Sequence, residues 1–408
     1  MALGRMSMPH ATLTRRTVLQ AAGALTLFHA NSGSAAAAAS AERKLVIVIL
    51  RGAADGLSAV PAFADPDYAR LRSRLAIAPP SEKDGALPLA QGFGLHPQMP
   101  FLHSLWTEQS LAVLHAAASP YRDRSHFDGQ DVLESGGAKV FAIGDGWLNR
   151  ALAPPAAREA VGIGRTIPLI LRGPAPVKSW SPSFIAAPNA DTVSRLMDLY
   201  AGDPVLGPSL AQAVETSAIA GSANMPEPGG MRGAYGAGAN LQMAEAATKL
   251  LSAPGGPAAA AMSIDGWDTH ANQGAATGQI AQRFKNLDDT LKALKTGLGT
   301  HWAKTVVIVA TEFGRTVAMN GTNGSDHGQG SVAFCCGGAV KGGRILGDWP
   351  GLSPKALFEG RDLAPVNDLR ALFAAALAQH WGLDRTTLET RIFPDAKGLA
   401  RFEGLITT

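Results

Sequence analysis

The sequence predicts an α/β protein, a three-layer α/β/α sandwich built around a mostly parallel sheet with long loop insertions. Short apolar runs without alternation recur along the chain, which is typical of strands covered on both faces. Stretches with helical periodicity lie between several of these runs. The 408 residues are 46% hydrophobic, enough to bury a large core. Strands that alternate with helices favour a parallel sheet between two helix layers.

The expected strands, in chain order, are Leu45–Leu50, Leu111–Ala116, Ile167–Leu171, Ala260–Ile264, Thr305–Ala310 and Val332–Cys336. A helix is predicted over 279–298, where apolar residues recur every three or four positions. A second helix is predicted over 367–381, with its cap near Asn367. Residues 140–160 and 200–258 are rich in Gly, Pro and Ala and are expected to be loops or insertions.

The first forty residues differ in character from the rest. Arg15 and Arg16 precede a modest apolar stretch, Val18–Phe28, which is short for a membrane span of about 20 residues. This segment resembles a twin-arginine export signal; the alternative is an ordinary amphipathic helix. We therefore expect residues 1–40 to be a signal peptide, residues 41–408 to be a single domain, and the mature protein to be periplasmic or secreted.

Charge excludes some classes of function. Lys and Arg number 36 against 33 Asp and Glu, so the formal charge is +3. The first forty residues hold three arginines and no acid, which leaves the remainder neutral. A neutral body disfavours nucleic-acid binding, which needs a basic face. Arg-Gly-Ala-Ala-Asp-Gly at 51–56 lacks the Gly-x-Gly-x-x-Gly turn of a dinucleotide oxidoreductase.

Acids, histidines and arginines follow the expected strands, where ligands bind in sheets of this kind. In chain order they are Arg51 and Asp55; Arg122, Ser125 and His126; Asp268 and His270; Glu312 and Arg315; and, just before the sixth strand, Asp326 and His327. Carboxylates bind Mn²⁺, Zn²⁺, Ca²⁺ and Mg²⁺, and imidazoles bind the first two. The conjunction of these groups predicts a divalent metal site.

Each group also has a structural alternative. Asp55 suits a helix cap, and Asp268 with His270 suits a loop pair that holds backbone groups. Asp-His-Gly at 326–328 suits a turn, and Glu312 with Arg315 suits an ion pair on one helical turn.

The motifs identify the chain as a member of a bacterial domain family of unknown function, numbered 1501. They are Arg-Gly-Ala-x-Asp-Gly at 51–56, Gly-Trp-Asp-Thr-His at 266–270, Thr-Glu-Phe-Gly-Arg at 311–315 and Asp-His-Gly at 326–328. The likeness covers roughly residues 43–390. That family is similar to the alkaline phosphatase and sulfatase superfamily, an α/β/α sandwich with a metal centre at its strand ends.

The resemblance implies the metal ligands, which are Asp55, Asp268, His270, Glu312, Asp326 and His327. The chemistry of the other groups supplies the remaining candidates. The candidate catalytic residues are Ser125, His126 and Arg122, with His126 or His270 moving protons, and Arg51 and Arg315 are expected to bind the substrate anion. In the sulfatase pattern Cys-x-Pro-x-Arg the nucleophile position falls on Ala118, which cannot attack, so Ser119, Ser125 or a metal-activated water would replace it.

Two functions remain open at this stage. The first is an exported metal-dependent hydrolase of phosphate or sulfate esters, acting on a small-molecule or polymer substrate. The second is a non-catalytic exported protein that keeps the fold and binds a surface polymer or a partner. Ala118 favours the second function, and the clustered acids and histidines favour the first.

Overall fold

The computed structural model describes residues 42–90, 92–153, 158–182, 190–220 and 237–407. The chain divides into two units, Met1–Ser40 and Ala41–Thr408, and every element below belongs to the second. The predicted export signal lies outside the described residues and stays a prediction. Within the described ranges, no helix is both long and apolar enough to cross a bilayer.

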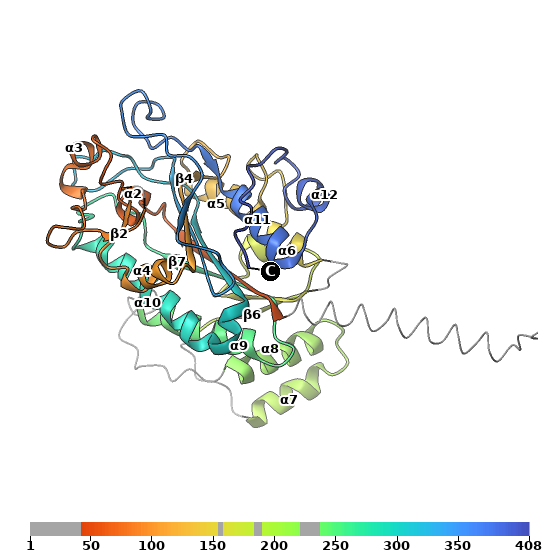
Figure 1. The fold of residues 1–408 in the computed structure, drawn as a ribbon. Coiled ribbons are helices and arrows are strands. Elements are labelled where there is room, and N and C mark those ends of the chain that lie inside the picture. Colours follow the sequence, from red (N-terminus) through yellow and green to blue (C-terminus); the bar gives the residue numbers. More distant parts are fainter. Residues whose placement is uncertain (1–41, 91, 154–157, 183–189, 221–236, 408) are drawn as a thin grey trace, which may run out of the picture. The chain divides into compact units, whose positions relative to one another are not determined.

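A mixed sheet forms the middle layer of the second unit (Figure 1). Its strand order is β10-β4-β9-β8-β1-β7-β5-β6, and β11 also pairs with β4. The bounds are β1 Lys44–Arg51, β4 Leu111–Ala118, β5 Ala160–Ile163, β6 Val177–Trp180, β7 Ala259–Asp265, β8 Thr305–Thr311, β9 Ser331–Cys336, β10 Arg344–Leu346 and β11 Asn367–Asp368. Strand β9 is antiparallel to β4 and β8, and the other described pairings in this sheet are parallel. The prediction of a mostly parallel sheet is confirmed.

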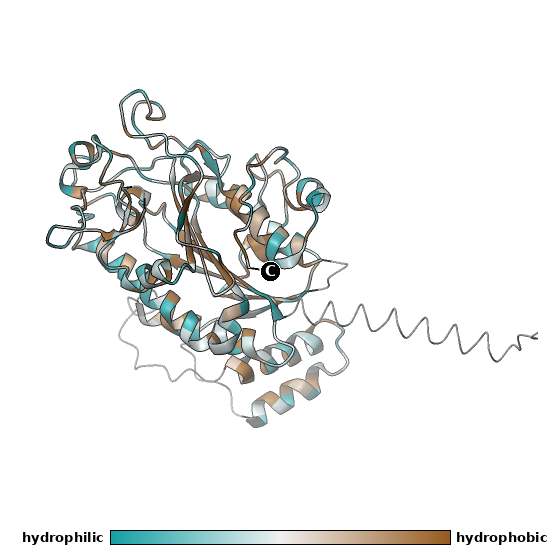
Figure 2. Cartoon of the chain, in the orientation of Figure 1, coloured by the Kyte–Doolittle hydropathy of each residue, from teal (hydrophilic) through white to brown (hydrophobic). Residues whose placement is uncertain are grey.

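Helices cover both faces of this sheet (Figure 1). One face packs against α4 (Pro100–Thr107), α9 (Ala237–Ser252) and α10 (Gln279–Leu298), and the other against α5 (His126–Ser135), α6 (Trp147–Leu152) and α11 (Leu369–Trp381). Side chains of β1 alternate between the two cores, with Val46 and Val48 in the first and Leu45 and Ile47 in the second. Figure 2 shows the resulting apolar middle layer. The three-layer sandwich is therefore confirmed.

The smaller elements lie in the connections. They are α2 Gly56–Ala59, α3 Tyr68–Arg72, α7 Ala190–Tyr200, α8 Leu206–Ala220, α12 Arg385–Thr387, the 3₁₀ turns η1 Ser73–Leu75, η2 Leu169–Leu171 and η4 Gly299–Lys304, the π turn η5 Leu388–Ile392, and the pair β2 Leu87–Pro88 and β3 Gly94–Leu95.

Most predicted strands and the long helix lie where the sequence places them, with one strand wrong. The run Ile167–Leu171 is not a strand, because Leu169–Leu171 form a 3₁₀ turn. The strand at that position in the sheet is β5, four residues long, which precedes this run and begins in the segment assigned to loops. Ala-Val-Gly-Ile is too short, and its glycine too weak a strand former, to stand out in the sequence.

Two further predictions need correction. Segment 200–258 contains α8 and α9 rather than loops alone; Pro208 lies in the first turn of α8, where its missing N–H costs nothing. Helix α11 begins at Leu369 and is capped by Asp368, whose carboxylate accepts from the Arg370 amide. Asn367 instead donates its side-chain amide to the His115 carbonyl.

The antiparallel direction of β9 decides what shares an edge of the sheet. Strands β1, β4, β7 and β8 are parallel to one another, so their carboxyl ends lie at one edge. Strand β9 runs the opposite way and therefore begins at that same edge. Residues that follow the parallel strands consequently meet the residues that precede Ser331.

Candidate metal centre

Three histidine side chains converge on the carboxylate of Asp268. The Nε2 atoms of His270 and His327 lie 2.9 and 3.1 Å from Oδ1, and Nε2 of His126 lies 3.5 Å from Oδ2. The Nε2 atoms of His270 and His327 are themselves 3.1 Å apart. Possible ligand atoms of His126, Asp268 and His327 all lie within 4.8 Å of one another. We call these four residues the His/Asp cluster.

Buried and outward-facing side chains alternate in the segment after β7, and the outward-facing ones are two members of the cluster. Trp267 and Thr269 are buried, whereas Asp268 and His270 turn outward. Trp267 donates its indole N–H to the Ile264 carbonyl at 3.0 Å, and the Thr269 hydroxyl donates to the Gln273 amide oxygen at 2.8 Å. These two anchors fix the direction of the side chains between them.

His126 opens α5, which follows β4 after the loop 119–125, and its ring is held from two sides. Nδ1 lies 2.8 Å from Glu312 Oε1, and the ring stacks on Phe313 at 5.0 Å between centroids. The buried Nε2 atom has no hydrogen-bond partner within the described residues. A carboxylate that accepts a hydrogen bond from Nδ1–H leaves the Nε2 lone pair free, which is how metal-ligating histidines are oriented.

The other two histidines follow the same pattern. Nδ1 of His327 lies 3.0 Å from the Arg124 carbonyl oxygen, an acceptor that requires the proton on Nδ1. Nδ1 of His270 lies 3.1 Å from Asp326 Oδ1, which also accepts from the Asn320 amide at 2.9 Å. In the neutral tautomer with the proton on Nδ1, all three rings present Nε2 as an acceptor toward the same point, beside the Asp268 carboxylate.

Glu312 is buried and contacts the His/Asp cluster through the His126 ring. Its carboxylate accepts from the Gly52 amide at 2.8 Å and from the Thr311 hydroxyl at 3.0 Å, besides His126. Burial acts to raise the pKa of Glu312, but these hydrogen bonds outweigh it, so the carboxyl stays ionised. Gly52 has φ +114, and a Cβ there would lie 2.6 Å from the Asp268 amide nitrogen, so only glycine fits.

Arg315 holds Asp268 from the protein side. Its buried guanidinium donates to Asp268 Oδ1 at 2.6 Å and to the Ser325 carbonyl. Burial acts to raise the pKa of Asp268, but the hydrogen bond and charge of Arg315 lower it below its ordinary value. Arg315, expected to bind a substrate anion, is committed to the protein and positions a cluster carboxylate.

The histidines differ in protonation. The hydrogen bond that His126 donates to the Glu312 carboxylate raises the pKa of His126. Burial, together with the neighbouring charge of His126, lowers the pKa of His327. The hydrogen bond of Asn320 is the main cause that lowers the pKa of Asp326.

The spacing and chemistry of the cluster fit a divalent cation. Two nitrogens bound to a tetrahedral zinc ion at about 2.0–2.1 Å would be about 3.3 Å apart, close to the 3.1 Å between His270 and His327. Facing lone pairs would otherwise repel each other, and a cation removes that repulsion. The residues present therefore fit a metal ion.

Asp55 lies outside the cluster. It is 1% exposed and caps α2, where it accepts from the amides of Leu57 and Ser58. Its other oxygen forms an ion pair with Arg72 and accepts from the Gln273 amide at 2.6 Å. Its oxygens are engaged by protein donors, so the helix-cap alternative describes Asp55 and we leave it out of the metal set.

The two remaining arginines are also engaged. Arg51 donates to Ser263, Gln130 and Glu134 at 3.0, 2.6 and 2.7 Å. Arg122 donates to the carbonyls of its own loop, at Ser119 and Tyr121. The structure thus leaves Arg51, Arg122 and Arg315 bound to protein groups rather than open to a ligand.

Ser125 precedes His126 at the N-terminus of the ten-residue helix α5. Its side chain makes no capping hydrogen bond to this helix, and its backbone amide donates to the Tyr121 hydroxyl at 2.9 Å.

Sequence reasoning missed Gln130. Its amide donates to Glu312 at 3.3 Å, and its carbonyl oxygen accepts from Arg51. It lies one helical turn after His126, so the i, i+4 spacing on α5 is the signal that places both on one face.

The family can now be stated. A family model described as a protein of unknown function (DUF1501) matches residues 96–392. The chain belongs to DUF1501. This DUF1501 match contains the whole His/Asp cluster and Glu312, whereas Arg51 and Asp55 precede it.

No curated protein matches this DUF1501 chain. Among solved structures, it is similar to the phosphonate monoester hydrolase of Agrobacterium radiobacter, with 10% identity over 88% of this chain and 79% of that one and a TM-score of 0.38. It is similar to the C-terminal periplasmic domain of EptC from Escherichia coli in complex with Zn, with 10% identity over 72% of each chain and a TM-score of 0.30. It is also similar to the alkaline phosphatase of the Antarctic bacterium TAB5, with 13% identity over 74% of this chain and 94% of that one and a TM-score of 0.31.

Proposed function

We propose that the protein is an exported metal-dependent hydrolase of phosphate or sulfate esters. The observation that supports this most is the convergence of three histidine Nε2 atoms on Asp268, each ring fixed through Nδ1. The carboxylate on which they converge is accessible to an ion, since Asp268 is 42% exposed.

The donor set favours Zn²⁺ or Mn²⁺ over Ca²⁺ or Mg²⁺, because imidazole nitrogen predominates over carboxylate oxygen. His126, Asp268, His270 and His327 would hold the ion. A bound ion of this kind polarises the ester oxygen and lowers the pKa of an attacking hydroxyl. His126, expected to move protons, belongs among the ligands.

The charges around the cluster balance when a divalent ion is present. Asp268, Glu312 and Asp326 contribute −3 and Arg315 contributes +1, so a divalent ion brings the total to 0 and would itself be the group that attracts an anion. Arg315 acts by fixing Asp268. Ser125 is the proposed nucleophile, because its hydroxyl is not spent on capping α5 and it adjoins His126. Ala118, buried at the end of β4, has no group that can attack.

One observation favours the alternative, a non-catalytic exported protein. Arg51, Arg122 and Arg315 already bind protein groups, so no arginine named from the sequence is free to bind an ester anion. In that case the metal would be structural.

Elemental analysis per chain tests the proposal. One equivalent of Zn or Mn, lost when Asp268→Asn is combined with His270→Ala, supports the cluster; Asp289→Asn, an exposed carboxylate on α10, is the matched control. Unchanged metal content in the double variant would contradict the assignment.

An ester screen then separates the two functions. Turnover of p-nitrophenyl phosphate or sulfate that Ser125→Ala abolishes supports the hydrolase. Retained activity in that variant would point to water as the nucleophile, and full metal content without turnover of any ester supports the non-catalytic protein. Export is tested separately, by replacing Arg15 and Arg16 with lysines and locating the product.

A further inference from the structure

A second polar site lies on the same edge of the sheet as the His/Asp cluster. It is a cavity of about 300 Å³ over the carboxyl ends of four neighbouring parallel strands, β1, β7, β5 and β6. Arg51, Asp265 and Ile163 are the last residues of three of these strands, and Ser181 directly follows the fourth. The first two turns of α9 contribute Ala239, Asn240 and Met243 to the lining. Cavities at this edge of a parallel sheet are the usual ligand sites.

Several polar groups in this cavity have no protein partner. Asn240 is only 7% exposed, yet its amide makes no hydrogen bond within the described residues. The Asp265 carboxylate and the hydroxyls of Thr166 and Ser181, which are exposed or half-buried and line the cavity, also make none within those residues. These four groups are therefore free to bond a ligand that enters the cavity.

The charges of the lining disfavour an anionic ligand group. Arg51 is neutralised by Glu134, which lies 2.7 Å from it and is itself buried. The charge of Asp265, which has no partner within the described residues, repels an anion. An amide, a carboxylate and two hydroxyls can bind several hydroxyls at once, while Ile163 and Met262 offer an apolar surface to C–H groups.

The cavity and the cluster are neighbours. Asp265 and Asp268 are three residues apart, so their Cα atoms are separated by at most about 11 Å. Gln130 joins the two regions, since it accepts from Arg51 on the cavity side and donates to Glu312 behind His126. One small molecule can therefore occupy both.

We propose that this cavity binds the neutral, hydroxyl-rich part of the substrate, a sugar or other polyol, through Asn240 and Asp265. The ester group of the same molecule then lies at the His/Asp cluster. The substrate class is a sugar or polyol ester of phosphoric or sulfuric acid; this last step rests on the proposed function, whereas polyol binding does not.

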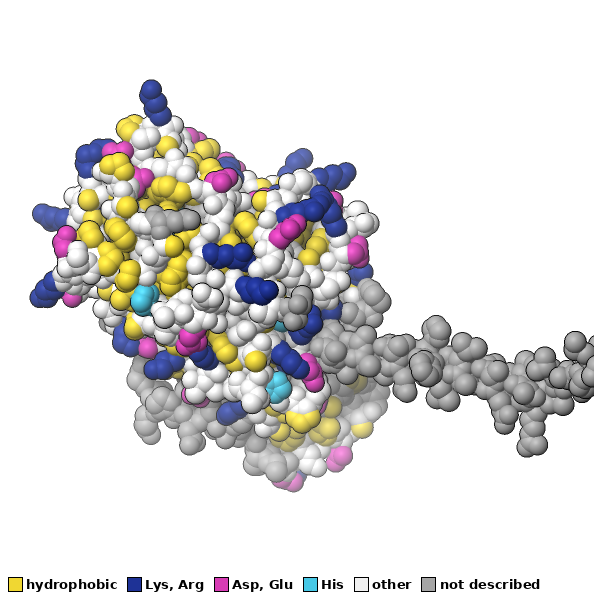
Figure 3. Space-filling view, in the orientation of Figure 1, with side chains coloured by type: hydrophobic (Ala, Val, Ile, Leu, Met, Phe, Trp, Pro, Cys, Tyr) yellow, Lys and Arg dark blue, Asp and Glu magenta, His cyan; other side chains and the backbone are white. Residues whose placement is uncertain are grey.

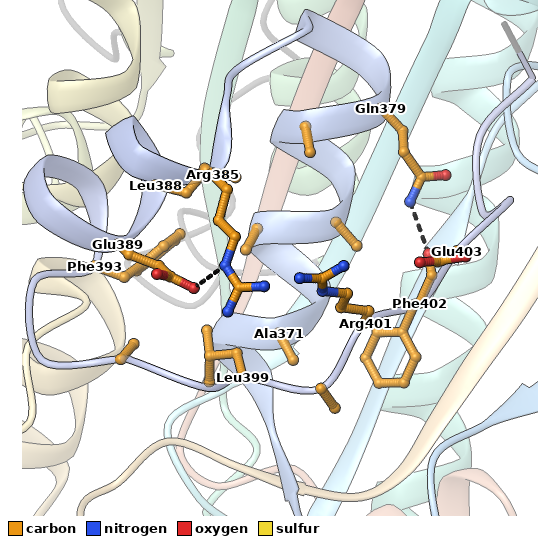
Figure 4. Close-up of a pocket in the computed structure, with 15 residues that line it drawn as sticks. Ala371, Gln379, Arg385, Leu388, Glu389, Phe393, Leu399, Arg401, Phe402 and Glu403 are labelled. Carbon is orange, nitrogen blue, oxygen red and sulfur yellow. Dashed lines mark hydrogen bonds and ion pairs between the residues drawn. The ribbon is translucent and has the colours of Figure 1, made fainter.

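Binding is tested without catalysis. Saturation-transfer NMR of the purified protein with D-glucose, D-galactose, D-mannose and myo-inositol is expected to show binding of at least one, with ethanolamine and inorganic phosphate as charged comparators. Asn240→Ala and Asp265→Asn are each expected to weaken that binding tenfold or more without loss of bound metal. Glu403→Gln, in the separate cavity behind α11 (Figure 4), is the control that leaves it unchanged. Absence of binding by all four polyols, or binding of ethanolamine through these residues, would overturn the proposal.

Kinetics then test the link to the cluster. The two variants are expected to lower kcat/KM for glucose 1-phosphate at least tenfold while p-nitrophenyl phosphate, which has no polyol, is hydrolysed as before. Equal losses for both esters would overturn the assignment of this cavity to the substrate. If no ester is hydrolysed although a polyol binds, the proposed function fails and the polyol site stands.

Discussion

Two aspartates follow neighbouring strands of the sheet and lie in different surroundings. Asp55 comes after β1 and Asp268 after β7, and each contacts a buried arginine, Arg72 or Arg315. Asp55 is enclosed by donors that belong to the protein. Asp268 has such a donor on one side only, and its other side faces histidine nitrogens. Position after a strand therefore does not distinguish a cap from a ligand.

The histidines near Asp55 and near Asp268 differ in how their ring nitrogens are used, and this difference separates a structural region from a candidate metal site. His96 and His115, whose surroundings include Asp55, use both ring nitrogens. In each, Nε2 bonds a backbone carbonyl and Nδ1 accepts a backbone amide. In His126 and His327 the Glu312 carboxylate and the Arg124 carbonyl hold Nδ1, and Nε2 faces the Asp268 carboxylate. The candidate site is therefore distinguished by ring nitrogens of several histidines that converge on one exposed carboxylate, Asp268.

Acid provides the largest contrast between the two regions. Burial lowers the pKa of His96, His115 and His380 to about 4, so below pH 6.5 the unfolded state binds more protons. Stability is therefore lost as the pH falls from 6.5 toward 4, on the order of 3 kcal/mol per histidine. Asp288, whose pKa burial raises to about 6, offsets part of this because its folded form gains a proton in that range.

Urea unfolding of the metal-free protein at pH 7, 6 and 5 measures this effect. A midpoint that does not change over that range would show that these histidines are not buried neutral. His126→Ala serves as the comparison, because Glu312 raises the pKa of His126 and its removal is not expected to protect against acid.

Asp55→Ala is expected to lower the free energy of unfolding by about 3–5 kcal/mol, since it leaves buried Arg72 without its carboxylate. Bound metal per folded chain is expected to stay the same. The mirror variant, Asp268→Asn, keeps an acceptor for Arg315 and is expected to lose metal with little change in the metal-free stability. Urea melts and elemental analysis of both variants check the pair; metal loss in Asp55→Ala would return Asp55 to the ligand set.

Glu312→Gln is expected to weaken metal binding by about 10–100-fold, because the carboxylate that orients His126 is lost. Competition with a chelator measures the change. Glu134→Gln, another buried glutamate on the Arg51 side, is expected to leave the affinity intact. Similar losses in both variants would mean that general destabilisation, not orientation of His126, is being measured.

Asp326→Asn is expected to have the smallest effect, at or below the tenfold lower limit for orienting groups. Asp326 is half exposed, and solvent can replace its contact with His270. The same chelator titration measures it. A loss as large as that of Glu312→Gln would make Asp326 a ligand rather than a positioning residue.

The sequence predicted the layers better than the roles of individual side chains. Continuous apolar runs identified β1, β4, β7, β8 and β9, because both faces of each strand are covered. Strand β5 was missed because four residues carry too little pattern. The meeting of Asp268, His270 and His327 followed from strand ends, but it depends on the direction of β9, which pairs with strands distant in the sequence.

The sequence could not predict which carboxylate would bind a metal ion and which would only position other side chains. Glu312 and Asp55 are buried by neighbours from other parts of the chain, Gly52 and Arg72 among them. Charge alone suggested free arginines, whereas Arg122 and Arg315 are taken up by carbonyls that only the folded loops bring near. The nearly balanced charge of the sequence also does not show where charges lie; Figure 3 shows Lys, Arg, Asp and Glu interspersed over one face of the molecule.

The antiparallel strand β9 also constrains the order of events during folding. It pairs with β8 and with β4, so Leu111 lies beside Cys336 and the central chain segments must be in place before this pairing closes. His327 reaches the cluster only when that long-range pairing has formed, and such non-local contacts form slowly. The ion would then bind to a site that has already formed instead of nucleating it. Refolding rates should accordingly be insensitive to added zinc, while the lifetime of the folded chain should lengthen with it.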